Sequence, residues 1–347
     1  MAKIITITSG KGGVGKTSIS LNMALSLAAS GHRVCLFDAD LGLANVNILT
    51  GIYPEFGLET VMAGEKQLRD ILVQDFQGLD IIPGSTGVAR MADMTPSQAG
   101  KLIQAFLDLD TYDYFIFDTS AGISAQVLAF CRACHEILLV ITPEPTSLTD
   151  AYSLVKVLTR YADIPPIRVV VNQVKSAAGA KKAYTQLKRT VERFLPISLS
   201  ARGIVAHDPN VPVAVASQIP FVMLFPDGPA ARSIQALARK MADSGGPAGD
   251  LPLEMFWNQC LGHMMPRGKA AEKKEADAAQ RKQREREDAR WERMEARMVE
   301  MTRALDEMKT LLEAQQQPVS TPSSQAEMPW EILDFEAWLA RRHSQAG

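Results

Sequence analysis

Short apolar runs alternate with longer stretches of helical periodicity from the N-terminus to about residue 243. Runs buried on both faces are typical of strands in parallel sheets that helices cover on each side. The pattern therefore predicts a doubly wound α/β domain with a mostly parallel sheet over residues 1–243, whose ligands bind at the carboxyl ends of the strands. The expected strands are Lys3–Thr8, Arg33–Phe37, Leu79–Pro83, Tyr114–Asp118, Glu136–Thr142 and Ile167–Asn172.

The pattern changes after residue 243. A glycine-rich break from Ser244 to Asp250 is followed by a short apolar piece, Leu251 to Met265, and the charge density rises from about Arg267. We expect residues 244–267 to form a linker with a short apolar segment, outside the α/β domain.

The charged stretch 268–314 predicts a helix with a coiled-coil seam over residues 291–312. Apolar residues recur there at heptad a and d spacing, over about three heptads. Two interpretations remain open, namely pairing with a second helix or a solitary solvated helix that packs on its own domain. The seam consists of Trp291, Met294, Met298, Met301, Leu305, Met308 and Leu312.

Residues 315–329 are rich in Gln, Pro and Ser and predict a flexible linker. The apolar cluster that follows, 330–343, predicts a short amphipathic docking segment for a protein partner or a membrane surface. Its carboxylates, Glu331, Asp334 and Glu336, would be repelled by anionic lipid and favour a protein partner. A tail that folds back onto the domain is an equal alternative.

Composition and charge narrow the class of protein. The chain has 347 residues, of which 46% are hydrophobic, and a formal net charge of -2, so no global basic field points to nucleic acid. No apolar run approaches the roughly 18 residues of a membrane span, and we expect a cytoplasmic protein, with peripheral membrane or polar association as a further option.

Four cysteines do not suggest a disulfide framework in a chain of this kind. Cys131, Cys134 and His135 match the pattern of covalent haem attachment, but a second cysteine pair for zinc is missing and an apolar run follows directly. We expect these residues to pack the end of a helix, and we expect neither haem nor an iron–sulfur cluster.

The stretch SGKGGVGKT, residues 9–17, satisfies the G-x-x-x-x-G-K-[ST] motif between an expected strand and a helix. The glycines allow backbone amides to surround phosphates, Lys16 neutralises phosphate oxygens, and the Thr17 hydroxyl binds Mg²⁺. The loop predicts that ATP and Mg²⁺ are the cofactors. The residues we expect to bind the nucleotide here are Gly10, Lys11, Gly12, Gly13, Val14, Gly15, Lys16, Thr17 and Ser18.

Acidic residues follow two further strands of the predicted sheet. Asp118 ends one strand, where it can hold Mg²⁺ through water while the Gly122 amide senses the γ-phosphate. Asp38 and Asp40 follow another strand, where Asp38 can support the magnesium shell and Asp40 can orient the attacking water. The alternative for each is an acidic cap on the following helix.

These motifs resemble the MinD/ParA family of deviant P-loop ATPases, with the flagellar-number regulators called FlhG or FleN as the most similar subgroup. The resemblance covers residues 1 to about 243. It rests on K-G-G-V-G-K-T with its additional lysine, D-A-D-L-G-L-A-N at 38–45, D-T-S-A-G at 118–122, T-P-E-P-T-S-L-T-D-A-Y at 142–152 and V-V-V-N at 169–172.

The resemblance implies a slow ATPase coupled to an ATP-dependent homodimer. It assigns Lys11 to the signature lysine that touches the partner subunit's phosphates, and a cation supplied in this way resembles an arginine finger. It also makes Asp40 the catalytic aspartate and Asn172 the residue that reads adenine. Asp150 corresponds to an aspartate of the dimer and partner surface.

Three functions remain open at this point. The first is a switch that controls the number or placement of a cellular structure, which the resemblance indicates to be flagella, with MinD-type control of the division site as its variant. The second is ParA-type partition or positioning of DNA or another cargo, such as chemosensory arrays, through a predicted basic helix. The third, an iron–sulfur carrier on the same fold, lacks the cysteines it needs. The helix carries Lys181, Lys182, Lys188, Arg189 and Arg193.

Overall fold

The computed structural model describes residues 2–40, 45–84, 91, 94–109, 112–161, 164–243 and 251–264. The expected seam at 291–312, the linker 315–329 and the docking segment 330–343 lie outside these residues.

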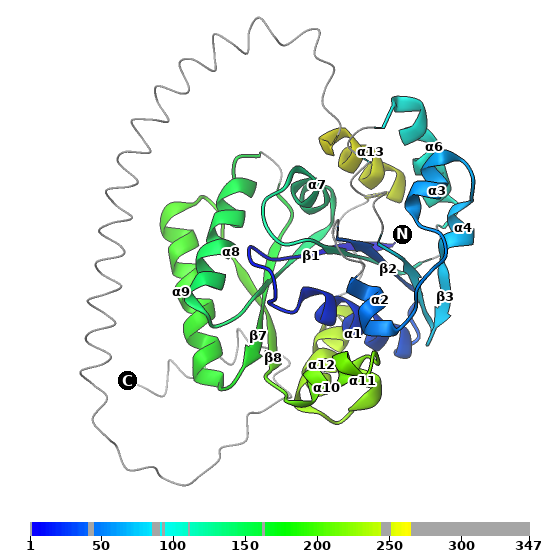
Figure 1. Cartoon of the computed structure of the whole chain (residues 1–347). Helices are drawn as coiled ribbons and strands as arrows, with labels where there is room; N and C mark the ends of the chain where they lie inside the picture. The colour runs from blue at the N-terminus through cyan, green and yellow to red at the C-terminus, as the bar shows by residue number, and fades with distance from the viewer. Residues whose placement is uncertain are drawn as a thin grey trace, which may run out of the picture. The chain divides into compact units, whose positions relative to one another are not determined.

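A single sheet runs through the described part of the chain (Figure 1). Every neighbouring pair of its strands is parallel except β3 and β4, which are antiparallel at one edge. The fold class expected from the sequence is therefore confirmed. In sheet order the strands are β3 (Val73–Phe76), β4 (Leu79–Ile82), β2 (Val34–Ala39), β5 (Tyr114–Thr119), β1 (Lys3–Thr8), β6 (Glu136–Ile141), β7 (Ile167–Val174) and β8 (Ser200–Ala206).

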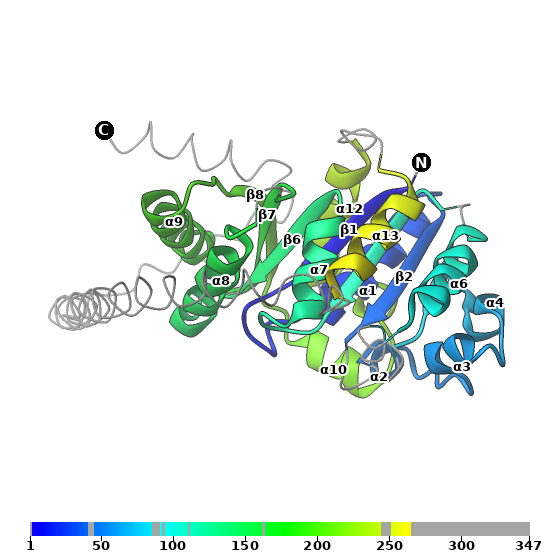
Figure 2. The ribbon, with the colours of Figure 1, turned by 90° about the horizontal axis from the view of Figure 1, so that it is seen from above.

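Helices cover both faces of the sheet (Figures 1 and 2). One layer contains α1 (Lys16–Ala29), α10 (Asn210–Ala216), α11 (Phe221–Leu224) and α12 (Pro229–Asp243), with α2 (Asn45–Thr50) beside α1 and α10. The other contains α7 (Ala125–Ala133), α8 (Pro145–Leu158), α9 (Ala177–Phe194) and α13 (Leu253–Met264). At the β3 edge lie α3 (Leu58–Ala63), α4 (Leu68–Ile71) and α6 (Pro96–Leu107).

Alternating side chains of the strands build a separate core on each face. In β1, Ile4 belongs to the cluster under α7 and α13, whereas Ile5 and Ile7 belong to the cluster under α1 and α12. Because successive side chains of a strand point to opposite faces, a wholly apolar run can fill both cores. This is why the expected runs became the central strands.

Two strands were missing from the sequence prediction. β8 contains Arg202 and Gly203, which break its apolar run; a Cβ on Gly203 would lie 2.7 Å from Leu237, so glycine lets α12 approach closely. β3 is short, half exposed and antiparallel, and it lacks the continuous apolar pattern of a buried strand.

Helix α13 revises the expected boundary at residue 243. We assigned residues 244–267 to a linker with a short apolar segment outside the α/β domain, but Phe256 and Trp257 of this segment are fully buried in the core beneath α13. The Trp257 ring stacks on Phe106 at a centroid distance of 3.9 Å and meets Phe37 edge to face at 6.1 Å. Residues 251–264 therefore belong to the α/β unit.

None of the described helices is both long and apolar enough to cross a membrane.

Candidate functional site

The phosphate loop connects β1 to α1 at the carboxyl edge of the sheet. Gly13 and Gly15 adopt φ values of 76° and 89°, in the left-handed region that favours glycine, and Gly15 directly precedes α1. The Ser9 hydroxyl donates a hydrogen bond to the Lys11 carbonyl at 2.7 Å, which closes the turn. The loop thus leads into a helix N-terminus, whose amides and dipole favour an anion.

Gly10 is needed for packing against α8. A Cβ at this position would lie 2.1 Å from the carbonyl carbon of Asp150, so a larger residue would separate the loop from the helix. Asp150, which the resemblance places at a dimer surface, contributes its backbone to this contact and has a half-buried side chain.

Lys16 begins α1 and is buried, with 7% of its surface exposed. Burial lowers the pKa of its ammonium group, while the charges of Asp118 and Asp40 raise it. Because a buried cation is costly without nearby negative charge, the carboxylates of Asp118 and Asp40 stabilise the charged form of Lys16. Phosphate oxygens of a bound nucleotide would add further negative charge.

Asp118 ends β5 and is completely buried beside α1. Its Oδ1 accepts a hydrogen bond from the Ser20 hydroxyl at 2.9 Å, whereas its Oδ2 is buried and no described residue is recorded as its hydrogen-bond partner. Burial raises the pKa of this carboxyl to about 6, against the lowering effect of hydrogen bonds from Thr17 and Ser20. An orphaned carboxylate oxygen next to the Thr17 hydroxyl is a donor set that fits Mg²⁺.

Within the described residues, no three His, Cys, Asp or Glu side chains form a group that could hold a metal ion.

Asp38, at the end of β2, anchors the segment that follows it. Its Oδ1 accepts from the Asp40 amide at 3.1 Å and its Oδ2 from the Val46 amide at 3.2 Å, at the start of α2. The side chain is fully buried, and a Cβ on Gly84 would lie 2.8 Å from its Cγ. Burial raises the pKa of Asp38 to about 8, and the Asp118 charge adds to this effect.

Asp40 is the last described residue before the gap at 41–44, and it is half buried. Its charge acts on Lys16, Asp38 and Asp118, which places all four residues in one electrostatic group. The structure therefore brings together the acidic residues that the sequence had placed at two strand ends.

Lys11 points to the N-terminus of α8. Its Nζ donates to Glu144 Oε2 and to Thr146 Oγ1, each at 2.8 Å, and 36% of its side chain is exposed. The second lysine of the loop is thus held at the rim by its own subunit, apart from the buried Lys16.

Gly122 and Asn172 both contact the loop. The Gly122 amide, expected to sense the γ-phosphate, donates to the Ser9 carbonyl at 2.9 Å with φ at 104°. Asn172, expected to read adenine, donates from Nδ2 to the Val14 carbonyl at 2.7 Å.

Sequence reasoning missed Ser20, Glu144 and Thr146. Ser20 lies one helical turn after Thr17 on α1, and this spacing could have suggested that it faces the same carboxylate. Glu144 and Thr146 lie in the T-P-E-P-T-S motif that we had quoted, but no local pattern pairs them with Lys11, which is more than 130 residues away in the chain.

Cys131, Cys134 and His135, which match the pattern of haem attachment, lie at the end of helix α7, as we expected. Cys131 and Cys134 are buried free thiols at the end of α7, and burial raises the pKa of both. His135 accepts a hydrogen bond at Nδ1 from the Ile4 amide.

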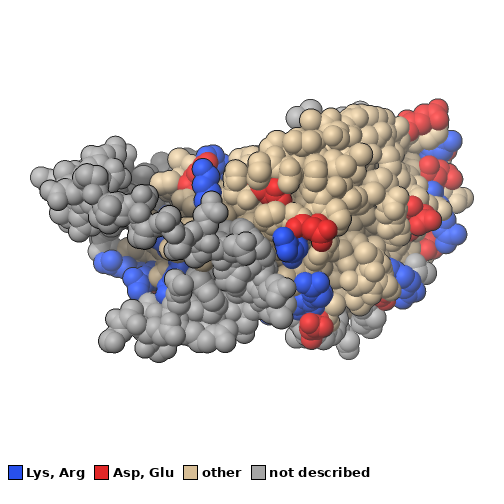
Figure 3. All heavy atoms as spheres, turned by 90° about the horizontal axis from the view of Figure 1, so that it is seen from below, with Lys and Arg blue, Asp and Glu red and all other residues tan. Residues whose placement is uncertain are grey.

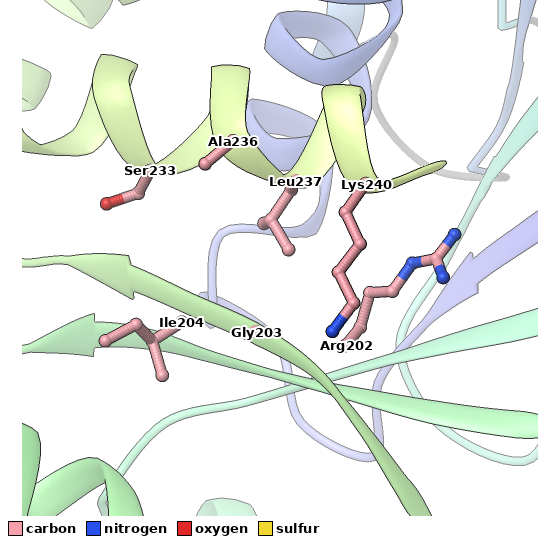
Figure 4. Close-up of a pocket in the computed structure, with 7 residues that line it drawn as sticks. All are labelled: Arg202, Gly203, Ile204, Ser233, Ala236, Leu237 and Lys240. Atoms are coloured by element: carbon pink, nitrogen blue, oxygen red, sulfur yellow. The ribbon is translucent and has the colours of Figure 1, made fainter. Parts of the chain in front are cut away.

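Two further features of the surface lie apart from the loop. A small hollow between β8 and α12 is lined by Arg202, Ser233 and Lys240 among others (Figure 4).

The lysines and arginines of the predicted basic helix do lie on one helix, α9. On the face shown in Figure 3, basic and acidic side chains of the described residues are interspersed, and a wide area carries neither.

Comparison with known proteins identifies the family to which the chain is similar. Residues 5–221 match the model of the CobQ/CobB/MinD/ParA nucleotide binding domain. The antiactivator FleN of Pseudomonas aeruginosa is 40% identical over 263 residues, which cover 75% of this chain and 94% of FleN. The flagellum site-determining protein YlxH of Helicobacter pylori is 36% identical over 189 residues, covering 53% of this chain and 63% of YlxH.

The fold agrees with the sequence match. The septum site-determining protein MinD of Pyrococcus horikoshii, solved in complex with Mg-ADP, superimposes with a TM-score of 0.54 at 25% identity, covering 70% of this chain and 96% of that one. Together with the phosphate loop and its acidic neighbours, these matches show that the chain belongs to the MinD/ParA family of nucleotide-binding P-loop ATPases.

Proposed function

We propose that the chain is an ATP-dependent dimerisation switch that controls the number or placement of flagella. The observation that carries the switch is Lys11, a half-exposed lysine in the phosphate loop beside a Lys16 that already supplies the buried cation. The similarity to a flagellum site-determining protein points to the flagellar role.

The nucleotide would bind with its phosphates at the amides of residues 10–18. Lys16 would neutralise phosphate oxygens, and the Thr17 hydroxyl with Asp118 Oδ2 would hold Mg²⁺. When bound, the ion neutralises charge on the phosphates. Asp38 would contribute to this shell at most through water, because each of its oxygens already accepts a backbone hydrogen bond.

Hydrolysis would depend on Asp40. Its carboxylate would orient the attacking water, and the hydrogen bond that the Asp40 amide donates to Asp38 Oδ1 would hold the Asp40 backbone in place. Positioning of this kind contributes most of the catalysis in phosphoryl transfer, so a displaced Asp40 carboxylate would slow hydrolysis.

Dimerisation would release Lys11 from Glu144 and Thr146 and direct it to the phosphates of the partner's ATP. An exposed ion pair is worth only about 0–1 kcal/mol, so a triphosphate can replace it. Because each subunit would complete the other's site, ATP binding and dimer formation would be coupled. Hydrolysis would return Lys11 to its own subunit.

Partner binding would use the segments at 291–312 and 330–343, which lie outside the described residues. They give the switch separate regions for contact with other proteins, in keeping with a role in positioning a cellular structure.

The test compares two trapped forms of the full chain as bait in a lysate of the source cells. Asp40→Ala with ATP and Mg²⁺ should accumulate as the dimer, whereas Lys16→Ala should stay nucleotide-free. We expect flagellar basal-body proteins on the first bait only. Recovery of cell-division or chromosome-partition proteins in their place would contradict the flagellar role and indicate division-site control or partition.

A further inference from the structure

Asn172 is held by two hydrogen bonds that run in opposite directions. Its Nδ2 donates to the Val14 carbonyl in the phosphate loop at 2.7 Å, and its Oδ1 accepts from the Gln173 amide at 2.8 Å. The residue is buried, with 7% of its surface exposed. Because one bond requires an NH₂ group and the other an oxygen, the two bonds together fix which end of the amide faces the loop.

The bond to Val14 fixes the orientation of the next peptide group. In a planar trans peptide the carbonyl of one residue and the N–H of the next point in opposite directions. Holding the Val14 carbonyl toward β7 therefore directs the Gly15 N–H to the other side. A phosphate loop works by presenting such N–H groups to an anion, so this orientation is part of its chemistry.

Gly15 and Asn172 also fit each other sterically. A Cβ on Gly15 would lie 2.4 Å from Asn172 Nδ2, and the φ of Gly15 is +89°. A glycine with this left-handed backbone leaves room for the amide to reach the Val14 carbonyl. The contact thus joins the end of β7 to the turn that precedes α1.

We propose that Asn172 is a positioning residue for the phosphate loop, in addition to any contact it makes with the base. The proposal deepens the nucleotide-binding function and rests on it. An asparagine side chain has two N–H groups and two oxygen lone pairs, and one of each is used within the protein. The remaining pair is free to read adenine, so a single side chain would couple recognition of the base to the geometry of the phosphate site.

The test uses a ligand that has phosphates but no base. The affinity of the full chain for magnesium tripolyphosphate is measured by calorimetry for wild type, for Asn172→Ala and for the control Gln173→Asn. Gln173 has a φ of 56°, a left-handed backbone that asparagine tolerates, and the control keeps its backbone amide. We expect Asn172→Ala to lose about five- to tenfold in tripolyphosphate affinity, in line with one lost hydrogen bond, and at least as much for ATP. The control should not change.

Unchanged tripolyphosphate affinity in Asn172→Ala, together with weaker ATP binding, would mean that Asn172 reads only the base, and this would overturn the proposal. A wild type that binds neither ligand would refute the nucleotide-binding function instead, which is a separate outcome.

A second measurement covers the case in which Asn172→Ala does not fold. Asn172→Asp keeps the shape and the acceptor for Gln173 but loses the donor to Val14 at pH 8. In ligand-free protein, ¹⁵N relaxation should show the order parameter of the Gly15 amide falling from about 0.85 towards 0.6. An unchanged value would overturn the proposal even if wild type binds no nucleotide.

Discussion

At the scale of single residues, the site is built from charged groups that differ in burial. Lys16, Asp38 and Asp118 are buried at the carboxyl edge of the sheet, whereas Lys11 lies at the rim in contact with α8. Because Lys16, Asp38 and Asp118 are buried, their pKa values respond to nearby charges and to any ion that binds among them. Exposure leaves Lys11 able to change partner at small cost.

Asp38 gives the ligand-free protein a characteristic pH dependence. Burial raises its pKa to about 8, whereas an unfolded carboxyl titrates near ~3.9. Between these values the folded protein retains a proton that the unfolded chain has released, so stability falls as the pH rises from about 4 to about 8 and levels off above. Asp118, with its pKa raised to about 6, adds to the fall at the lower end.

We therefore predict that the free energy of unfolding of wild type decreases by about 1 kcal/mol per pH unit between pH 6 and 8, in the absence of nucleotide and Mg²⁺. In Asp38→Asn this decrease should be largely absent, because the titrating group is gone. Urea denaturation across this range measures both slopes. Equal slopes in the two proteins would show that Asp38 is ionised in the folded state.

At the scale of elements, α13 shows how a helix beyond the motif region completes the core. Its buried side chains cover α6 and α7, and Trp257 lies among the aromatic rings of β2, β5, α6 and α7. From the sequence we predicted only a short apolar piece here, because a glycine-rich break separates it from the α/β pattern and only the tertiary contacts reveal its role.

We predict that Trp257→Ala destabilises the protein by about 3–5 kcal/mol, as expected for a large side chain removed from a packed core. Met255 lies on the same helix with 47% of its surface exposed, and Met255→Ala should change stability by less than about 0.5 kcal/mol. Denaturant midpoints measure both. A small effect of Trp257→Ala would mean that α13 does not contribute to the core.

The central strands and the loop could be predicted because local patterns determine them. The runs that became β1, β5, β6 and β7 are rich in aliphatic and aromatic side chains, and the glycines and lysines of residues 10–17 form a motif with a known physical role. Strand β8 could not be predicted, since Arg202 and Gly203 interrupt its run. The Lys11–Glu144 and Asn172–Val14 contacts were equally inaccessible, because they join segments that only the fold brings together.

At the scale of the whole molecule, the proposed switch depends on Lys11, which lies at the rim of the phosphate loop while Lys16 is buried. The family of the chain and the position of Lys11 lead to a single account, in which ATP joins two subunits and hydrolysis separates them.

The most direct test is the molecular mass of the full chain in solution, measured by sedimentation with ADP and with ATP, each with Mg²⁺. We predict a larger species with ATP only for wild type, and none for Lys16→Ala, which should not bind nucleotide. Lys11→Ala should bind ATP with an affinity close to that of wild type yet show no ATP-dependent increase in mass. An ATP-dependent increase that persists in Lys11→Ala, or a loss of ATP binding in this variant, would contradict the switch.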